Sequence, residues 1–157
     1  MTKAIQDFYP DDVAHCYGCG RLNDHGLHVR SVWEGDELVA HFTPREYHTA
    51  IPGFVYGGLI ASLIDCHSTG TASAAAHKHA GFAVDEGSPP RFVTGMLKVD
   101  YLRPTPIDGE LVIRARAVEI KPRKVVVHST LYAHGEPCAK GEVIAVLMPE
   151  GMIKSEG

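Results

Sequence analysis

The sequence predicts an α+β protein in which one antiparallel β-sheet curls around a single long helix. Three observations support this prediction. Two short segments that alternate apolar and polar residues come first, a long helical segment follows, and four more alternating segments complete the chain. Because strands and helices do not alternate along the chain, and no G-x-G-x-x-G or Gly-Lys-Ser/Thr loop occurs, a nucleotide-binding βαβ fold is not expected.

The first predicted element is a β-hairpin over residues 27–42. The stretches LHVRSVW and ELVAHF alternate apolar and polar residues on either side of residues 34–36, a turn-forming Glu-Gly-Asp sequence. Two prolines and a glycine then break regular structure within residues 43–54, which predicts a loop. The segment before Gly26 is irregular and is predicted to form an N-terminal arm.

The predicted helix begins near Gly57 and ends at Gly81, a residue type that is favoured just past helix C-termini. Its first half has a broad apolar face, whereas its second half is rich in glycine and alanine. Such small side chains predict close packing against a neighbouring surface. Four consecutive antiparallel strands are expected after the helix, separated by turns rich in proline or glycine, at residues 92–102, 110–120, 124–132 and 138–147.

The bulk composition fits one domain, because 157 residues with 45% hydrophobic content can bury one full-sized core. The net charge of -4 gives no electrostatic reason to expect a nucleic-acid partner. No apolar stretch approaches the roughly 20 residues of a membrane span, and no apolar signal-peptide core is present, so we expect a cytoplasmic protein that binds no membrane. Four scattered cysteines are expected to be reduced thiols.

Three segments together resemble the PaaI-like acyl-CoA thioesterases of the hotdog superfamily. Residues 52–65, PGFVYGGLIASLID, are similar to the P-G-x-x-H-G-G-x-x-x-x-x-x-D signature of that family. Residues 94–104, TGMLKVDYLRP, are similar to the strand that follows the helix, and residues 16–27 are similar to the opening of one branch of the family. The resemblance implies a hotdog fold, paired subunits and hydrolysis of acyl-CoA thioesters.

The resemblance also suggests how the chain is divided into parts and which partners it binds. Residues 1–26 are then an N-terminal arm, residues 27–150 the hotdog thioesterase domain and residues 151–157 a C-terminal tail. We expect a homodimer, possibly paired further into a tetramer, with an acyl-CoA as substrate. No cofactor is expected, because the CoA is part of the substrate.

The catalytic groups that the resemblance implies are a backbone N–H of Gly57 or Gly58 and the carboxylate of Asp65. An N–H at a helix N-terminus stabilises the oxyanion that forms on a thioester carbonyl, and glycine leaves that amide uncovered. Asp65 would activate water or attack the carbonyl directly, and the hydroxyl of Thr94 would hold the water. The alternatives are a plain tight turn, an exposed or ion-paired aspartate, and an ordinary β-branched strand residue.

The spacing of these groups predicts a site shared between subunits. Gly58 and Asp65 are seven residues apart, which is two helical turns and about 10 Å along the axis. One helix therefore cannot place both groups on the same carbonyl. If both act on one thioester, the amide comes from one subunit and the carboxylate from its two-fold mate.

Two positions depart from the family pattern. Tyr56 stands where the family has a histidine, and Ala50 stands where it commonly has an asparagine. The Tyr56 phenol can still donate a hydrogen bond, and His48 lies close enough in sequence to replace a polar group. A Ser-His-Asp triad is not expected, because neighbouring side chains on a helix point in different directions; His67 is instead predicted to be a neutral, hydrogen-bonded histidine.

Two further groups of residues, the paired cysteines and four basic residues, each allow a structural and a functional interpretation. Cys16 and Cys19 form a C-x-x-C pair that zinc binds when more ligands are near, and three histidines lie close in sequence, but we predict buried structural cysteines and no metal. Basic residues are expected to bind the CoA phosphates or, equally, to be solvated surface charges; they are Arg103, Lys121, Arg123 and Lys124.

Two other functions stay open at this point. One is non-catalytic binding or sensing of acyl-CoA, which the changes at Tyr56 and Ala50 favour. The other is a hotdog hydratase or dehydratase, which needs a paired aspartate and histidine.

Overall fold

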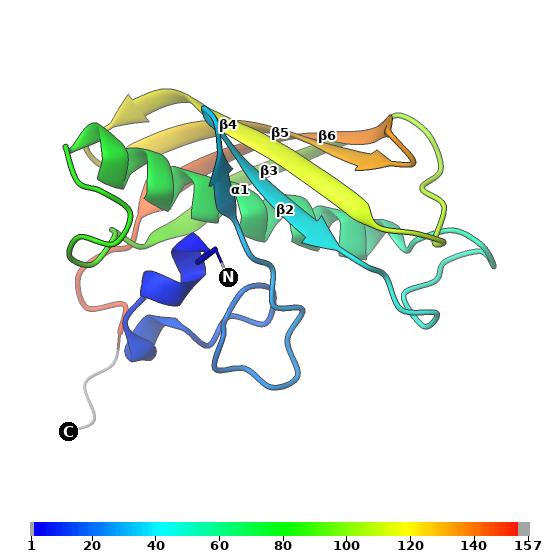
Figure 1. The fold of residues 1–157 in the computed structure, drawn as a ribbon, viewed down its shortest axis with the longest axis horizontal. Helices are drawn as coiled ribbons and strands as arrows, with labels where there is room; N and C mark the ends of the chain where they lie inside the picture. Colours follow the sequence, from blue (N-terminus) through cyan, green and yellow to red (C-terminus); the bar gives the residue numbers. More distant parts are fainter. Residues whose placement is uncertain (1, 154–157) are drawn as a thin grey trace.

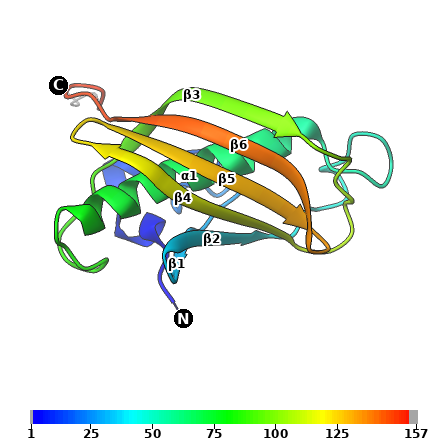
Figure 2. The same ribbon diagram turned by 90° about the horizontal axis from the view of Figure 1, so that it is seen from above.

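A six-stranded antiparallel sheet covers one face of helix α1 in the computed structural model, which describes residues 2–153 (Figure 1). The strand order is β1-β2-β4-β5-β6-β3, so β1 and β3 form the two edges (Figure 2). The predicted sheet around one helix is therefore confirmed. The elements are η1 (Ile5–Phe8), η2 (Asp11–Val13), β1 (Val32–Glu34), β2 (Glu37–Phe42), α1 (Gly57–His79), β3 (Phe92–Tyr101), β4 (Leu111–Lys121), β5 (Lys124–Ala133) and β6 (Glu136–Leu147).

The predicted hairpin over residues 27–42 is wrong in its first five residues. Residues 27–31 run beside the N-terminal arm, because the N–H groups of Leu27 and Val29 donate to the carbonyls of Tyr17 and Gly18 at 2.8 and 2.9 Å. Their backbone groups are thus unavailable to the sheet, and β1 begins only at Val32. The four strands after the helix agree with their predicted ranges to within two residues at every end.

The N-terminal arm lies below α1, on the side opposite the sheet (Figure 1). Two short 3-10 helices, η1 and η2, are the regular elements of this arm. The predicted C-terminal tail, residues 151–157, lies partly outside the described residues, and the division of the chain into three parts stays a prediction. Within residues 2–153, α1 is not apolar enough to cross a membrane, and no other helix is long enough.

The main core lies between the inner face of the sheet and the first half of α1. Leu63 and Ile64 are fully buried against the inward-facing residues of the central strands. Gly141 of β6 crosses directly over Ile64, and a Cβ on Gly141 would overlap the Cγ2 atom of Ile64. The absence of a side chain at this position allows the strand and the helix to approach closely.

The second half of α1 packs against the N-terminal arm, as its small residues predict. A Cβ on Gly70 would lie 2.6 Å from the side-chain nitrogen of Gln6 and 3.0 Å from the hydroxyl of Ser31. The hydroxyl of Ser31 accepts from Gln6 at 3.1 Å, and Gln6 in turn accepts from the Ser31 N–H at 2.8 Å. Buried polar groups of the arm are thus hydrogen-bonded next to a helix residue that has no side chain.

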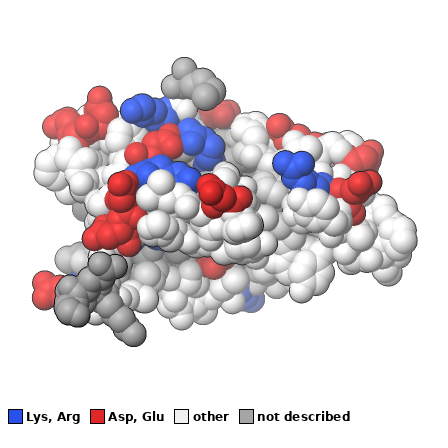
Figure 3. All heavy atoms as spheres, turned by 90° about the horizontal axis from the view of Figure 1, so that it is seen from below, with Lys and Arg blue, Asp and Glu red and all other residues white. Residues whose placement is uncertain are grey.

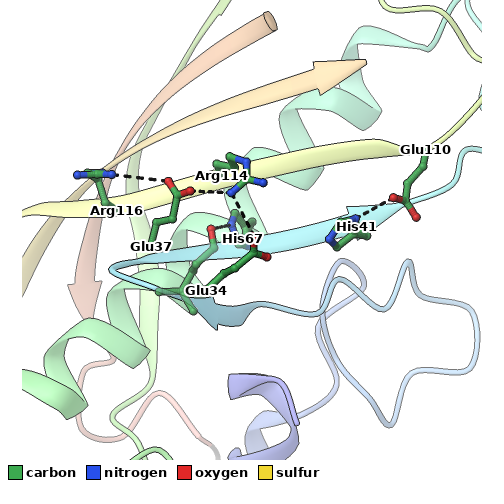
Figure 4. A network of polar contacts seen from close by, with 8 residues as sticks. Glu34, Glu37, His41, His67, Glu110, Arg114 and Arg116 are labelled. Carbon is green, nitrogen blue, oxygen red and sulfur yellow. Dashed lines mark hydrogen bonds and ion pairs between the residues drawn. The ribbon is translucent and has the colours of Figure 1, made fainter. Parts of the chain in front are cut away.

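The surface carries charges of both signs side by side. On the face seen from below, lysine and arginine are interspersed with aspartate and glutamate and form no large basic patch (Figure 3). On the outer face of the sheet, Arg114 of β4 contacts Glu37 at 2.7 Å and Glu34 at 3.6 Å (Figure 4). Arg116 extends this ladder to Glu37 at 3.7 Å. These exposed pairs form a solvated outer layer and contribute little to stability individually.

The close crossing at Gly141 leads to a first prediction. Gly141→Val adds a β-branched side chain that a strand would ordinarily favour, but here its Cβ overlaps Ile64. We expect the free energy of unfolding to fall by about 1–3 kcal/mol, measured by urea denaturation. Adding Ile64→Ala should make the double variant more stable than the sum of the two single losses implies. Strict additivity would show that the two positions do not crowd each other.

Candidate active site

Asp65 and Thr94 meet where α1 passes the start of β3. The Thr94 hydroxyl donates to Oδ1 of Asp65 at 2.5 Å. The Asp65 side chain is half-buried, and among residues 2–153 no basic nitrogen lies within salt-bridge distance of it. The structure therefore does not place Asp65 in an ion pair or fully in solvent, the two structural alternatives. Its role in catalysis stays a prediction.

The surroundings of Asp65 raise the pKa of its carboxyl. Partial burial raises the pKa of the Asp65 carboxyl above its ordinary value. The hydrogen bond from Thr94 acts in the opposite direction, because it stabilises the charged form. A nearby Cys16 sulfur raises the pKa further, and the Arg91 guanidinium lowers it. A half-buried carboxylate with a raised pKa and one hydroxyl donor has the properties of a general base.

The double glycine forms the first turn of α1. The carbonyl of Tyr56 accepts from the N–H groups of Leu59 and Ile60 at 3.1 and 3.3 Å. The amides of Gly57 and Gly58 precede these groups, so helix geometry leaves them without an intrahelical acceptor. A helix N-terminus with such N–H groups suits an anionic ligand, although the Tyr56 ring lies against Gly58. Whether they bind one is a prediction.

Two tyrosines surround this turn. The Tyr101 hydroxyl, at the end of β3, donates to the carbonyl of Gly57 at 2.7 Å. The Tyr56 ring folds back against Gly58, because a Cβ there would lie 2.6 Å from its Cζ atom. Tyr56 is 58% exposed, so its phenol remains accessible at the helix start. Sequence reasoning missed Tyr101, because its bond to Gly57 joins residues that are 44 positions apart.

His48 does not reach the double glycine through its side chain. Its Nδ1 accepts from the backbone N–H of Arg45 at 2.9 Å, and its ring packs against Phe42 and Tyr47. Its contact with Tyr56 is made by the backbone, where the His48 carbonyl accepts at 2.9 Å. Partial burial and the charge of Arg45 lower the pKa of the His48 imidazole. The side chain therefore stabilises its own loop.

An apolar cavity of about 530 Å³ opens beside the first turn of α1. The loop before the helix, the start of α1 and the end of β3 form its walls. This volume is within the range of small-molecule sites, and its lining is mostly apolar with few polar groups. The lining includes Ile51, Phe54, Gly57, Ile60, Tyr101 and Arg103.

The four predicted basic residues separate into two groups within one chain. Arg103 lines the apolar cavity and contacts Glu136 at 3.2 Å. Lys121, Arg123 and Lys124 lie at the β4–β5 turn, and Lys121 contributes to a different cavity with Ala76 and His79 of the last helical turn. A single basic patch within one subunit is therefore not formed.

Three cysteines come together beside Asp65. The sulfurs of Cys16, Cys19 and Cys66 all lie within 4.8 Å of one another. The sequence does not predict that Cys66 lies near the C-x-x-C segment, because 50 residues separate it from Cys16. The three histidines near the C-x-x-C, His15, His25 and His28, are not part of this group. Cys138 lies elsewhere, and its sulfur contacts the carbonyl of Glu136 at 3.5 Å.

His67 is neutral and hydrogen-bonded, as predicted. Its Nε2 donates to the Leu38 carbonyl at 2.9 Å, so its Nδ1 accepts from the Ser31 hydroxyl at 2.7 Å. Complete burial lowers the pKa of the His67 imidazole to about 4. Both ring nitrogens are used by β2 and the segment before β1, which leaves neither for catalysis.

One long helix packed against a six-stranded antiparallel sheet defines the hotdog class of folds. Comparison with protein families agrees. A model of the thioesterase superfamily matches residues 52–139, more than half of the chain. The chain belongs to the thioesterase superfamily. The predicted hotdog fold is confirmed, and the predicted thioester hydrolysis stays a prediction for this chain.

Individual relatives support the same assignment. The acyl-coenzyme A thioesterase THEM4 of Xenopus laevis is 30% identical over 71% of this chain, and that of Mus musculus is 31% identical over 62%. The chain spans less than half the length of these relatives, 44% and 36%. A thioesterase superfamily protein from Shewanella loihica is 48% identical, with a TM-score of 0.68 over 90% of this chain and 100% of that chain. Mouse thioesterase superfamily member 2, at 24% identity, shares the fold with a TM-score of 0.60 over 78% of this chain and 84% of that chain.

The contact between Thr94 and Asp65 leads to a second prediction. Thr94→Val keeps the shape of the side chain but leaves a half-buried carboxylate without its hydroxyl donor. We expect a loss of about 1 kcal/mol in the free energy of unfolding at neutral pH, measured by urea denaturation. Thr94→Ser retains the hydroxyl and should remain close to the wild type. Equal losses for the two variants would mean that the methyl group of Thr94, not its hydroxyl, provides the stability.

Proposed function

We propose that the protein hydrolyses acyl-CoA thioesters to the free acid and CoA. The observation that carries this proposal is the position of Asp65. It is a half-buried carboxylate without an ion-pair partner among the described residues, and a hydroxyl on an edge strand orients it. The same strand ends beside the double-glycine turn and the apolar cavity. The names of the THEM4 relatives support an acyl-CoA as the substrate.

In this proposal the start of α1 stabilises the developing negative charge. As the tetrahedral intermediate forms, the thioester oxygen becomes an oxyanion, and the amides of Gly57 and Gly58 donate to it. The partial positive charge at the helix N-terminus adds to this stabilisation. Such amides are rigid, so they require little reorganisation during the reaction.

Asp65 then supplies the attacking group. Thr94 donates to Oδ1, which leaves Oδ2 without a partner among the described residues and available to take a proton from water. Direct attack by the carboxylate, through a transient anhydride, uses the same geometry. Both routes release CoA as the thiol and leave the acyl group as a carboxylic acid.

The site requires a second subunit, because the two groups are too far apart along one helix. Among residues 2–153, strand β3 pairs only with β6 and forms an edge of the sheet (Figure 2). Its exposed side includes Leu97, 38% exposed, and Tyr101, 54% exposed. An exposed, partly apolar edge is suited to pairing with a second copy. We infer an antiparallel pairing of β3 with the same strand of a second copy in a homodimer.

The register of this pairing follows from the contacts at the two ends of β3. Thr94 holds Asp65, and Tyr101 holds Gly57. A two-fold axis between Leu97 and Lys98 sets Thr94 opposite the partner subunit's Tyr101. It thereby brings Asp65 of one subunit toward the double glycine of the other, and the dimer has two such sites.

Within one subunit, the geometry favours Arg103 for binding the CoA phosphates. Arg103 lies on the apolar cavity beside Gly57, where a phosphate-bearing group leaving the pocket would pass. Lys121, Arg123 and Lys124 are at the far end of α1 in the same subunit. In an antiparallel pair of helices, the far end of one helix extends beyond the start of the other, so these residues would contribute from the second subunit.

One observation favours a non-catalytic acyl-CoA binding protein as a second candidate. The Tyr56 ring lies against Gly58, where the thioester carbonyl must approach. The cavity would be kept, but access to the amides would depend on movement of this ring. The hydratase alternative has no comparable support, because His67, two residues from Asp65, uses both nitrogens elsewhere.

A thiol-release assay on a panel of acyl-CoAs tests the proposal, which gives the third prediction. Asp65→Asn keeps size and polarity but removes the base, so we expect turnover to fall about 10²–10⁴-fold. The oligomeric state, measured by light scattering, should not change. Asp36→Asn is the matched control, because it makes the same change at an exposed carboxylate on the β1–β2 turn, and it should keep wild-type turnover. Saturable CoA-ester binding by the wild type with no thiol release would instead identify a binding protein.

Mixed dimers test the shared site, which gives the fourth prediction. Gly57→Pro removes one amide N–H at the first helical position, where proline is tolerated. Chains with Asp65→Asn and chains with Gly57→Pro should each be nearly inactive alone. Their co-expressed mixture should regain about a quarter of wild-type turnover, because half of the dimers contain one intact site of two. A mixture as inactive as its parents would place both groups within one chain.

A further inference from the structure

The three-cysteine group has the spacing of a metal site. The sulfurs of Cys16 and Cys66 are 3.8 Å apart, and all three sulfurs lie within 4.8 Å of one another. Two sulfurs that each lie about 2.3 Å from a tetrahedral zinc ion are about 3.8 Å apart. A disulfide would require about 2.05 Å, so these cysteines are free thiols, and the Cys16–Cys66 distance equals that between two ligands of one tetrahedral ion.

The turn at residues 16–20 brings these sulfurs together. The N–H of Gly18 points at the Cys16 sulfur at 3.4 Å, and the N–H of Gly20 closes the turn onto the Cys16 carbonyl at 2.7 Å. A Cβ on Gly18 would overlap the Cys66 sulfur, so this close approach requires glycine. An N–H directed at a thiolate is the type of outer contact that orients a metal ligand.

The surroundings suit a thiolate-bound ion. Cys19 and Cys66 are only 3% and 8% exposed, while Cys16 is half-buried and leaves one side of the group open. The Arg91 guanidinium lies 4.0 Å from the Cys19 sulfur. Thiolates are soft ligands that select zinc over magnesium or calcium.

We propose that Cys16, Cys19 and Cys66 bind one zinc ion. The described residues supply three ligand atoms, so water or another small ligand takes the fourth position. The ion joins the N-terminal arm to α1 at the residue after Asp65. This proposal departs from the prediction of no metal and is independent of the thioesterase proposal, because it rests on sulfur positions alone.

Metal content and cobalt spectroscopy on the full chain test the site, which is the fifth prediction. Protein purified without an affinity tag should contain about one zinc per chain. Cobalt added to anaerobic, metal-free protein should give the thiolate-to-cobalt charge-transfer band and the visible bands of a tetrahedral ion. Cys16→Ser and Cys66→Ser should each weaken cobalt binding at least about tenfold. Cys138→Ser, a cysteine outside the group, should bind like the wild type.

Each result of these measurements either supports the zinc site or overturns it. If Cys66→Ser does not fold, Cys16→Ser provides the test, because Cys16 is half-buried in the arm. Folded wild-type protein that contains no zinc and gives no cobalt bands would overturn the proposal. The protein can also be prepared without reducing agent, in air and under nitrogen. If it then binds no metal and has a mass lower by two hydrogen atoms, two cysteines form a disulfide, and the proposal is overturned. None of these readouts depends on thioester turnover.

Discussion

One turn of helix α1 connects three separate segments of the chain, and the candidate site depends on this turn. Asp65 contacts Thr94 of β3, Cys66 contacts Cys16 of the arm, and His67 contacts Leu38 of β2. Consecutive residues on a helix point about 100° apart, so three polar or soft side chains in a row necessarily face three directions. Each finds a partner there, which sets the rotation of the helix relative to the sheet and the arm.

The edge strand β3 is joined to the same helix at two points. Thr94 and Tyr101 are near its two ends, and their hydroxyls bond to Asp65 and to the Gly57 carbonyl. The strand therefore keeps a fixed position along the helix, although the outer edge of the strand has no neighbour within the described chain. Fixing an exposed edge in this way also fixes any second copy that pairs with it. In the proposed dimer, side-chain bonds within each subunit thus set the geometry between the subunits.

The fold could be predicted from the sequence because its signals are local. Alternation along β3 to β6 and the small residues of α1 depend on near neighbours, and they locate each element closely. The hairpin prediction was wrong where a distant partner competes, since Leu27 and Val29 bond to the arm and not to the sheet. The same limit applies to Cys66 and Tyr101, whose partners lie 50 and 44 residues away. Sequence spacing carries no information on such contacts. Asp65 and the double glycine lie on one helix, so their spacing in the sequence does give their distance along the helix axis.

Burying polar groups in the central turn of a helix is unfavourable unless every group is paired, and this requirement explains why the turn is so specific. A shift of α1 by one residue would place Asp65 where Cys66 packs against the arm and would move His67 away from Leu38. An apolar helix would tolerate such a shift, because one alkyl contact can replace another. Here the shift would leave a carboxylate and an imidazole buried without partners. The polar turn therefore selects one arrangement of helix, arm and edge strand, and that arrangement holds the Asp65 carboxylate in one fixed position, as the proposed catalysis requires.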